Sequence, residues 1–104
     1  MNERTVAGFD WDQGNRAKCQ KHGVSIAAIE AVFHAPHRIA PNPAHSIDET
    51  RLLAIGNGNG SRPIFVAFTM RDCAEGLLIR PISARYMHRK EIETYETETA
   101  QPDQ

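Results

Sequence analysis

The chain has 104 residues, of which 40% are hydrophobic and 24% charged, the composition of one soluble globular domain. No apolar run approaches the roughly 20 residues that span a bilayer, the first five residues lack a secretory signal pattern, and two cysteines are too few for a fold held by disulfides. The net charge of −1 is unevenly distributed: residues 51–90 carry seven basic and two acidic side chains (+5), whereas residues 91–104 carry five acidic ones and no basic one (−5). We therefore expect a single cytoplasmic domain over residues 1–104, with a polar tail over about 97–104 and no membrane association.

A short strand is predicted at residues 8–11, followed by a first helix. Asp12 is a suitable N-cap, because its carboxylate can accept hydrogen bonds from the free amides of the first turn. The helix is expected to reach about His22, since Gly23 can adopt the left-handed conformation that ends helices.

A second helix is predicted to begin after Ser25, another suitable N-cap, and to end before Pro36. Between them, apolar residues recur at the three- and four-residue spacing of a helix with one buried face. The segment 37–44 contains two prolines and is therefore expected to form an edge strand or a loop. The apolar helix positions are Ile26, Ile29, Val32 and Phe33.

Three strands joined by hairpins are predicted in the second half of the chain, over about residues 51–55, 64–70 and 77–83. The middle strand is apolar on both faces, which indicates a central strand covered on both sides. Pro81 has no amide hydrogen, so we expect a β-bulge or a free edge beside it. With a last helix over about 86–98, the prediction is an α+β fold: an antiparallel sheet, formed by the three-strand meander and the short N-terminal strand, with two N-terminal helices and one C-terminal helix.

The basic middle of the chain is almost entirely arginine, whose planar guanidinium group suits phosphate. Such residues fit the metal-free cleavage of RNA by its own 2′-hydroxyl, a reaction that needs a base, an acid and cations around the phosphate. The same arginines also fit a plain solvated surface, and charge alone does not separate these interpretations. Candidate cations are Lys21, Arg51, Arg62, Arg71, Arg80 and Arg85, and candidate proton carriers are His22, His45 and Glu49.

Arg71 and Arg80 leave and enter the second hairpin, so they are expected to lie close together across antiparallel strands. Two guanidinium groups at short range repel each other unless an anion lies between them. A phosphate fits this place, and so does the carboxylate of Asp72 or Glu75.

Two further features have alternative interpretations. Trp11, the only tryptophan, is expected in the core, although an indole can also stack on a nucleobase. Cys19 and His22, together with His34 and His37, have a spacing that resembles zinc ligands. Because the first pair falls within a helix and the second straddles a proline, we expect no metal site, and no motif indicates a cofactor.

Several short motifs follow one another in a definite order: Phe9-Asp10-Trp11-Asp12, Lys21-His22-Gly23-Val24-Ser25, His45-Ser46 with Glu49 and Arg51, Ile55-Gly56, Phe68-Thr69 with Arg71, Ile79-Arg80, Ile82-Ser83-Ala84-Arg85 and Tyr95-Glu96. In this order and spacing they resemble BrnT-type toxins of toxin–antitoxin systems, over nearly the whole chain. The resemblance implies a RelE-like ribonuclease fold and the inhibition of translation by RNA cleavage. It also implies a small DNA-binding antitoxin of the BrnA type, through which the toxin would be held at promoter DNA.

The first hypothesis is therefore a ribonuclease toxin that acts on RNA. The alternative is a non-catalytic protein–protein module, or a degenerate toxin, whose arginines only bind an acidic partner. A neighbouring gene for a ribbon-helix-helix-like protein would favour the toxin. In the first hypothesis Arg71, Arg80 and Arg85 bind the scissile phosphate, Lys21 and His22 supply proton transfer or charge, and Trp11, Arg51 and Arg62 position the RNA.

Overall fold

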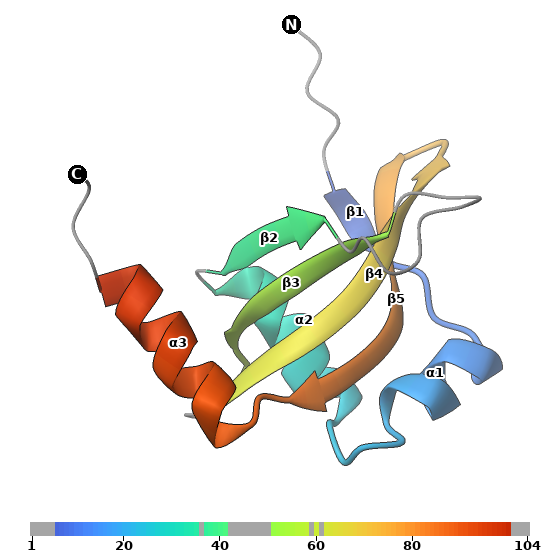
Figure 1. Ribbon diagram of the computed structural model, residues 1–104. Helices are drawn as coiled ribbons and strands as arrows, with labels where there is room; N and C mark the ends of the chain where they lie inside the picture. Colours follow the sequence, from blue (N-terminus) through green and yellow to red (C-terminus); the bar gives the residue numbers. More distant parts are fainter. Residues whose placement is uncertain (1–5, 36, 42–50, 59, 61, 101–104) are drawn as a thin grey trace, which may run out of the picture.

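The computed structural model describes residues 6–35, 37–41, 51–58, 60 and 62–100. In these ranges five strands form one mixed sheet in the order β1-β5-β4-β3-β2 (Figure 1). Strand β1 is parallel to β5, and the other neighbouring strands are antiparallel. The elements are β1 (Val6–Phe9), α1 (Gln13–Cys19), α2 (Ile26–His34), β2 (Arg38–Pro41), β3 (Leu52–Asn57), β4 (Pro63–Cys73), β5 (Gly76–Tyr86) and α3 (Arg89–Ala100).

The predicted α+β class is confirmed, as are the three-strand meander, the N-terminal strand and the three helices. The sheet differs in two details: the segment expected to form an edge strand or a loop is a fifth strand, β2, at the edge, and the sheet is mixed rather than wholly antiparallel. The parallel pairing arises between β1 and β5, the first and last strands of the chain. Its direction depends on how the whole chain crosses over, which local sequence patterns do not record.

Local signals set both N-terminal helices. The Asp12 carboxylate accepts a hydrogen bond from the Asn15 amide (2.9 Å), while the Asn15 side chain accepts one from the Asp12 amide (2.7 Å). The Ser25 hydroxyl likewise accepts from the Ala28 amide at 3.1 Å, so both predicted N-caps are confirmed. The first helix is shorter than predicted: it ends at Cys19, and the chain turns before Gly23, whose φ is +88°.

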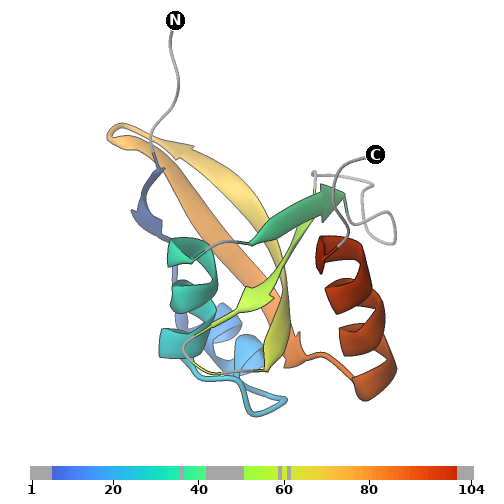
Figure 2. The ribbon, with the colours of Figure 1, turned by 90° about the vertical axis from the view of Figure 1, so that its left-hand side faces the viewer.

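The helices lie on different sides of the sheet, and the core forms on one side only. Helix α2 covers one face, α1 packs beside β5, and α3 stands on the side opposite α2 (Figure 2). The predicted cover on both sides of the middle strand is incomplete on the face away from α2, where Phe65 and Ala67 of β4 line an open groove. The core consists of Cys19, Val24, Ala28, Ile29, Val32, Ala54, Ile64, Val66, Phe68, Ile79 and Ala84.

Strand β5 contains the β-bulge that Pro81 predicts. Phe68 of β4 pairs with Pro81 and Ala67 pairs with Ser83, so Ile82 has no partner on β4. On the side of β5 away from β4, strand β1 has already ended at this point. The side-chain amide of Asn15 supplies the hydrogen bond there that a neighbouring strand would otherwise make. It donates hydrogen bonds to the carbonyl oxygens of Pro81 and Asp10, both at 2.9 Å.

One buried hydroxyl provides a test of the packing. Thr69 in β4 is 2% exposed, and its Oγ1 has no hydrogen-bond partner among the residues that the structure describes. Because an unpaired buried polar group costs about 1–3 kcal/mol, Thr69→Val should raise the free energy of unfolding by about 1 kcal/mol and Tm by roughly 4 °C. Thr69→Ser, which keeps the hydroxyl, should not be stabilised, and a lower Tm for Thr69→Val would show that the hydroxyl is satisfied in solution.

Candidate functional site

The bulge in β5 brings separate arginines to one face of the sheet. Side chains that pair across antiparallel strands point to the same side. Arg80 pairs with Thr69 and Arg85 with Phe65, and the four-residue spacing of those partners on β4 places both arginines on one face. Arg80 and Arg85 are themselves five residues apart, so regular alternation would have put them on opposite faces. The extra residue, Ile82, removes this mismatch.

Three more arginines occupy the same side, which lies opposite α2. Arg71 pairs with Leu78, which lies two residues before Arg80 on β5 and therefore on the same face. Arg38 of β2 pairs with Ile55 of β3, which in turn pairs with Phe65 of β4. Arg51 directly precedes β3 and lines the groove on this side. We refer to the side that carries Arg38, Arg51, Arg71, Arg80 and Arg85 as the arginine face.

A groove of about 490 Å³ is formed on the arginine face. Its floor consists of β3, β4 and β5, and one wall is the end of α1 with the turn that follows. Three residues selected from the sequence, His22, Arg51 and Arg85, meet here, and Lys18 and Ser83 join them. We call this site the arginine groove; it is lined by Lys18, His22, Arg51, Leu53, Phe65, Ala67, Ile82, Ser83, Ala84 and Arg85.

Arg85 is held in place by three neighbours. Its guanidinium carbon lies 4.5 Å from the centroid of the Phe65 ring. Its two terminal nitrogens, Nη1 and Nη2, donate to the two carboxylate oxygens of Glu91, each at 3.0 Å, and Nη1 also donates to the Tyr86 carbonyl at 3.2 Å. Together these contacts fix the plane of the guanidinium group at the edge of the groove. The Arg85 side chain remains 41% exposed there.

Glu91 was not among the residues selected from the sequence. Its carboxylate also accepts a hydrogen bond from the His88 amide at 2.7 Å, at the start of α3. The hydrogen bonds from Arg85 and from this amide lower the pKa of Glu91 to about 2. An acidic residue three positions after the residue that precedes a helix is a capping signal that the sequence does contain, but the contact of Glu91 with Arg85 depends on the tertiary fold.

Arg71 and Arg80 are close together as predicted, but the anion between them is Asp10. Its Oδ2 lies 3.4 Å from Nη1 of Arg80 and 4.0 Å from Nε of Arg71. Arg80 also donates to Asp12 at 2.8 Å, and hydrogen bonds from the Asn15 amide and then from Arg80 lower the pKa of Asp12. This carboxylate comes from the end of β1, which lies next to β5 in the sheet.

Besides Arg71 and Arg80, three of the selected residues do not line the arginine groove. Lys21 is exposed in the turn after α1, and Lys18, near the end of α1, lines the groove instead. The indole Nε1 of Trp11 donates to Glu30 at 2.8 Å, and the partly buried ring packs against the core. Arg62 lies over the Tyr86 ring at 4.9 Å and donates to the Met87 carbonyl. The candidate proton carriers His45 and Glu49 lie outside the described residues.

The four residues with zinc-like spacing are separated in the fold. Cys19 is buried in the core, where burial raises the pKa of its thiol to about 11. His22 lines the arginine groove, whereas His34 and His37 lie on the α2 side of the sheet. No group of three His, Cys, Asp or Glu side chains suited to a metal ion occurs within the described ranges. None of the helices in the described part of the chain is long and apolar enough to cross a membrane.

Fold and site together define a small α+β protein with a groove lined by arginine, lysine, histidine and serine side chains. A family model described as the ribonuclease toxin BrnT of type II toxin–antitoxin systems matches residues 11–91. The chain belongs to this family of ribonuclease toxins, and the resemblance seen in the sequence is confirmed. A type II toxin has an antitoxin as its partner. No curated protein matches the chain.

Proposed function

We propose that this chain is a metal-independent endoribonuclease toxin that cleaves RNA in the arginine groove. The observation that carries the proposal is the meeting of His22, Arg51 and Arg85 in one groove of a chain from a ribonuclease family. Inhibition of translation would follow from the loss of RNA. We also propose that a BrnA-type antitoxin inhibits the ribonuclease, and that the toxin binds promoter DNA only through this antitoxin.

The proposed reaction is an internal transesterification. The 2′-oxygen of RNA attacks the adjacent phosphorus, the bond from phosphorus to the 5′-oxygen breaks, and a proton moves from the 2′-hydroxyl to a base while the 5′-oxygen receives one. Arg51 and Arg85 bind the phosphate and stabilise the extra negative charge of the transition state. His22 transfers a proton, since an imidazole can act as acid or base near neutral pH. Lys18 adds positive charge at the same wall of the groove.

Arg71 and Arg80 receive a secondary role in this proposal. Both lie on the arginine face next to the Asp10 carboxylate, but neither lines the arginine groove. They are therefore assigned to a phosphate beside the scissile one. Trp11 and Arg62 are assigned to the structure of the domain, and Lys21 to the charge at the rim of the groove.

Expression of the chain without its antitoxin should arrest growth and degrade cellular RNA. The purified protein should cleave single-stranded RNA at an undiminished rate in excess chelator, because the proposed chemistry uses only side chains of the groove. The Arg85→Ala variant, purified in the same way, controls for contaminating nuclease. Activity that disappears with chelator and returns with a divalent cation would contradict the mechanism.

The alternative, a non-catalytic module that binds an acidic partner, is supported by one observation. The guanidinium group of Arg85 already binds a carboxylate with two parallel hydrogen bonds, which is the geometry that an acidic protein segment would offer. The chelator experiment separates the two functions, because a binding module leaves RNA intact. The two are also connected, since an antitoxin carboxylate at Arg51 or Arg85 would exclude phosphate from the groove.

A further inference from the structure

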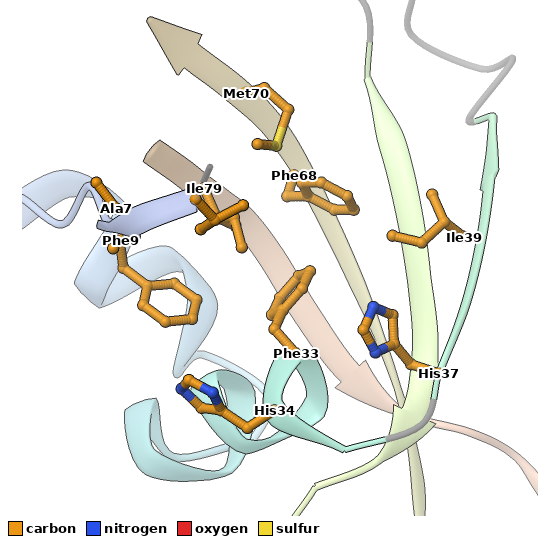
Figure 3. A pocket seen from close by; sticks show the side chains of 11 residues that line it. Ala7, Phe9, Phe33, His34, His37, Ile39, Phe68, Met70 and Ile79 are labelled. Atoms are coloured by element: carbon orange, nitrogen blue, oxygen red, sulfur yellow. The ribbon is translucent and has the colours of Figure 1, made fainter. Parts of the chain in front are cut away.

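A second groove lies on the α2 side of the sheet, and nothing in the proposed reaction uses it. Its volume is about 510 Å³, and it is open to the surface between β1, the end of α2 and β2. The rings of Phe9, Phe33 and Phe68 form its inner wall (Figure 3). We refer to it as the apolar groove, with Val6 and Ile39 as its two rim residues.

The apolar groove exists because α2 is too short for the sheet it covers. Nine helical residues extend over about 14 Å, whereas the eleven residues of β4 extend over about 36 Å. The β4–β5 hairpin therefore continues past the end of α2 (Figure 2). Met70 and Ile79, which pair across the two strands, lie in this uncovered part and complete the floor.

The rim of the apolar groove exposes large hydrophobic side chains to solvent. Val6 is 48% and Ile39 50% exposed, and they are the exposed large hydrophobic residues of the described chain. They lie on the two edge strands, β1 and β2, and thus on opposite sides of the groove. An exposed apolar surface arranged around a groove is typical of a protein-binding site.

The polar groups of the apolar groove are too few for a small-molecule site. Its polar side chains are His34 and His37, whose rings stack edge-to-face on Phe9 and Phe33 respectively. His37 Nδ1 is already hydrogen-bonded to the Ala35 carbonyl at 2.7 Å. Small-molecule sites fix the orientation of the ligand by several convergent polar groups. A groove with apolar walls fits instead the apolar side chains of an amphipathic helix.

A different protein fits the apolar groove better than a second copy of this chain. A second copy of this chain would present the same concave surface, and two concave grooves do not fill each other. Helix α3 of a second copy is also unsuitable, because its sequence, RKEIETYETETA, has only isolated apolar residues among acidic and hydroxyl side chains. The family supplies a protein partner, since a type II toxin is paired with an antitoxin.

We propose that the apolar groove anchors the antitoxin through the apolar side chains of one amphipathic helix. This inference rests on the proposed function and specifies where the partner is held. The apolar groove and the arginine groove lie on opposite sides of the sheet, so affinity for the antitoxin and exclusion of RNA are supplied by different surfaces. Substitutions at the anchor should therefore weaken the complex and leave the ribonuclease of the free toxin unchanged.

The test uses Val6→Glu and Ile39→Glu, with Ala27→Glu as a matched control on the exposed side of α2. The probe is the protein encoded beside the toxin gene, purified as a complex with each variant. Each rim substitution should raise the Kd at least tenfold, because a carboxylate replaces an apolar contact. Ala27→Glu should bind like the wild type. Thermal melts confirm folding, and Ile39→Thr, which retains a strand-forming residue, should show a smaller loss of affinity in the same direction.

Unchanged affinity in both rim variants overturns the inference, as does a wild-type chain that binds no product of the neighbouring gene. Variants that separate a homodimer but bind the antitoxin normally also overturn it, because the groove would then belong to a second copy. RNA cleavage by the free proteins is measured in parallel. Its absence in the wild-type chain counts against the proposed function, whereas normal cleavage with normal antitoxin binding in the rim variants counts only against the anchor.

Discussion

Replacing Arg85 by alanine is expected to lower the rate of RNA cleavage by about 100- to 1,000-fold, the usual effect of removing one donor to the transition state. The fold should survive. The ion pair with Glu91 is partly exposed to solvent, and such pairs contribute about 1 kcal/mol or less. The contact with the Phe65 ring adds a similarly small amount, about 0.5–1 kcal/mol at an exposed site.

Single-turnover cleavage of single-stranded RNA, with a thermal melt of each protein, measures the two effects separately. Arg89→Ala removes an exposed arginine from α3 that does not line the arginine groove, so it should cleave at the wild-type rate. Arg85→Lys keeps the charge but loses the planar fork, and it should fall between the wild type and Arg85→Ala. A wild-type rate for Arg85→Ala would remove Arg85 from the mechanism.

Replacing Asn15 by leucine is expected to lower the free energy of unfolding by about 3 kcal/mol. Asn15 is 5% exposed, and its amide is the donor to the carbonyl oxygens of Asp10 and Pro81. Leucine leaves both carbonyls without this donor, and a buried unpaired group costs about 1–3 kcal/mol. It also removes the Asn15 side-chain acceptor, one half of the capping box at the start of α1. The decrease in Tm should exceed roughly 10 °C for a domain of this size.

Asn15→Asp distinguishes the two tasks of this side chain. Aspartate keeps the oxygen that accepts from the Asp12 amide, but it cannot donate to the two carbonyls. If Asn15 stabilises the fold mainly as a donor, Asn15→Asp should be at least as unstable as Asn15→Leu. If Asn15→Asp melts like the wild type, capping alone accounts for the residue, and the support of the bulge by Asn15 would be refuted.

Much of the fold could be predicted because its determinants are local. Asp12 and Ser25 cap helices by contacts with residues three positions away, and Pro81 marks the bulge by its missing amide hydrogen. The parallel pairing of β1 with β5 could not be predicted, because it joins segments about 70 residues apart. The same reason explains why Asp10 was missed as the anion beside Arg80.

The candidate site was predictable in its residue types and less so in its geometry. Arginine enrichment indicated an anion site, and Arg51 and Arg85 do meet there with His22. However, the face that a strand residue occupies is predicted from the alternation of side chains along the strand. The unpaired residue Ile82 shifts this alternation for the rest of β5. The apolar groove was equally hidden, because it results from the difference in length between α2 and β4 rather than from any motif.

The shared use of Glu91 couples two equilibria. This carboxylate binds Arg85 and also accepts a hydrogen bond from the His88 amide at the start of α3. Its pKa of about 2 means that it is ionised at neutral pH. An anion that displaces Glu91 from Arg85 therefore removes one of the contacts that dock α3 on the sheet. By thermodynamic linkage, release of the Glu91–Arg85 contact strengthens anion binding by the same factor by which a bound anion weakens the docking of α3. Hydrogen exchange of the α3 amides thus reports the occupancy of a groove that those amides do not touch.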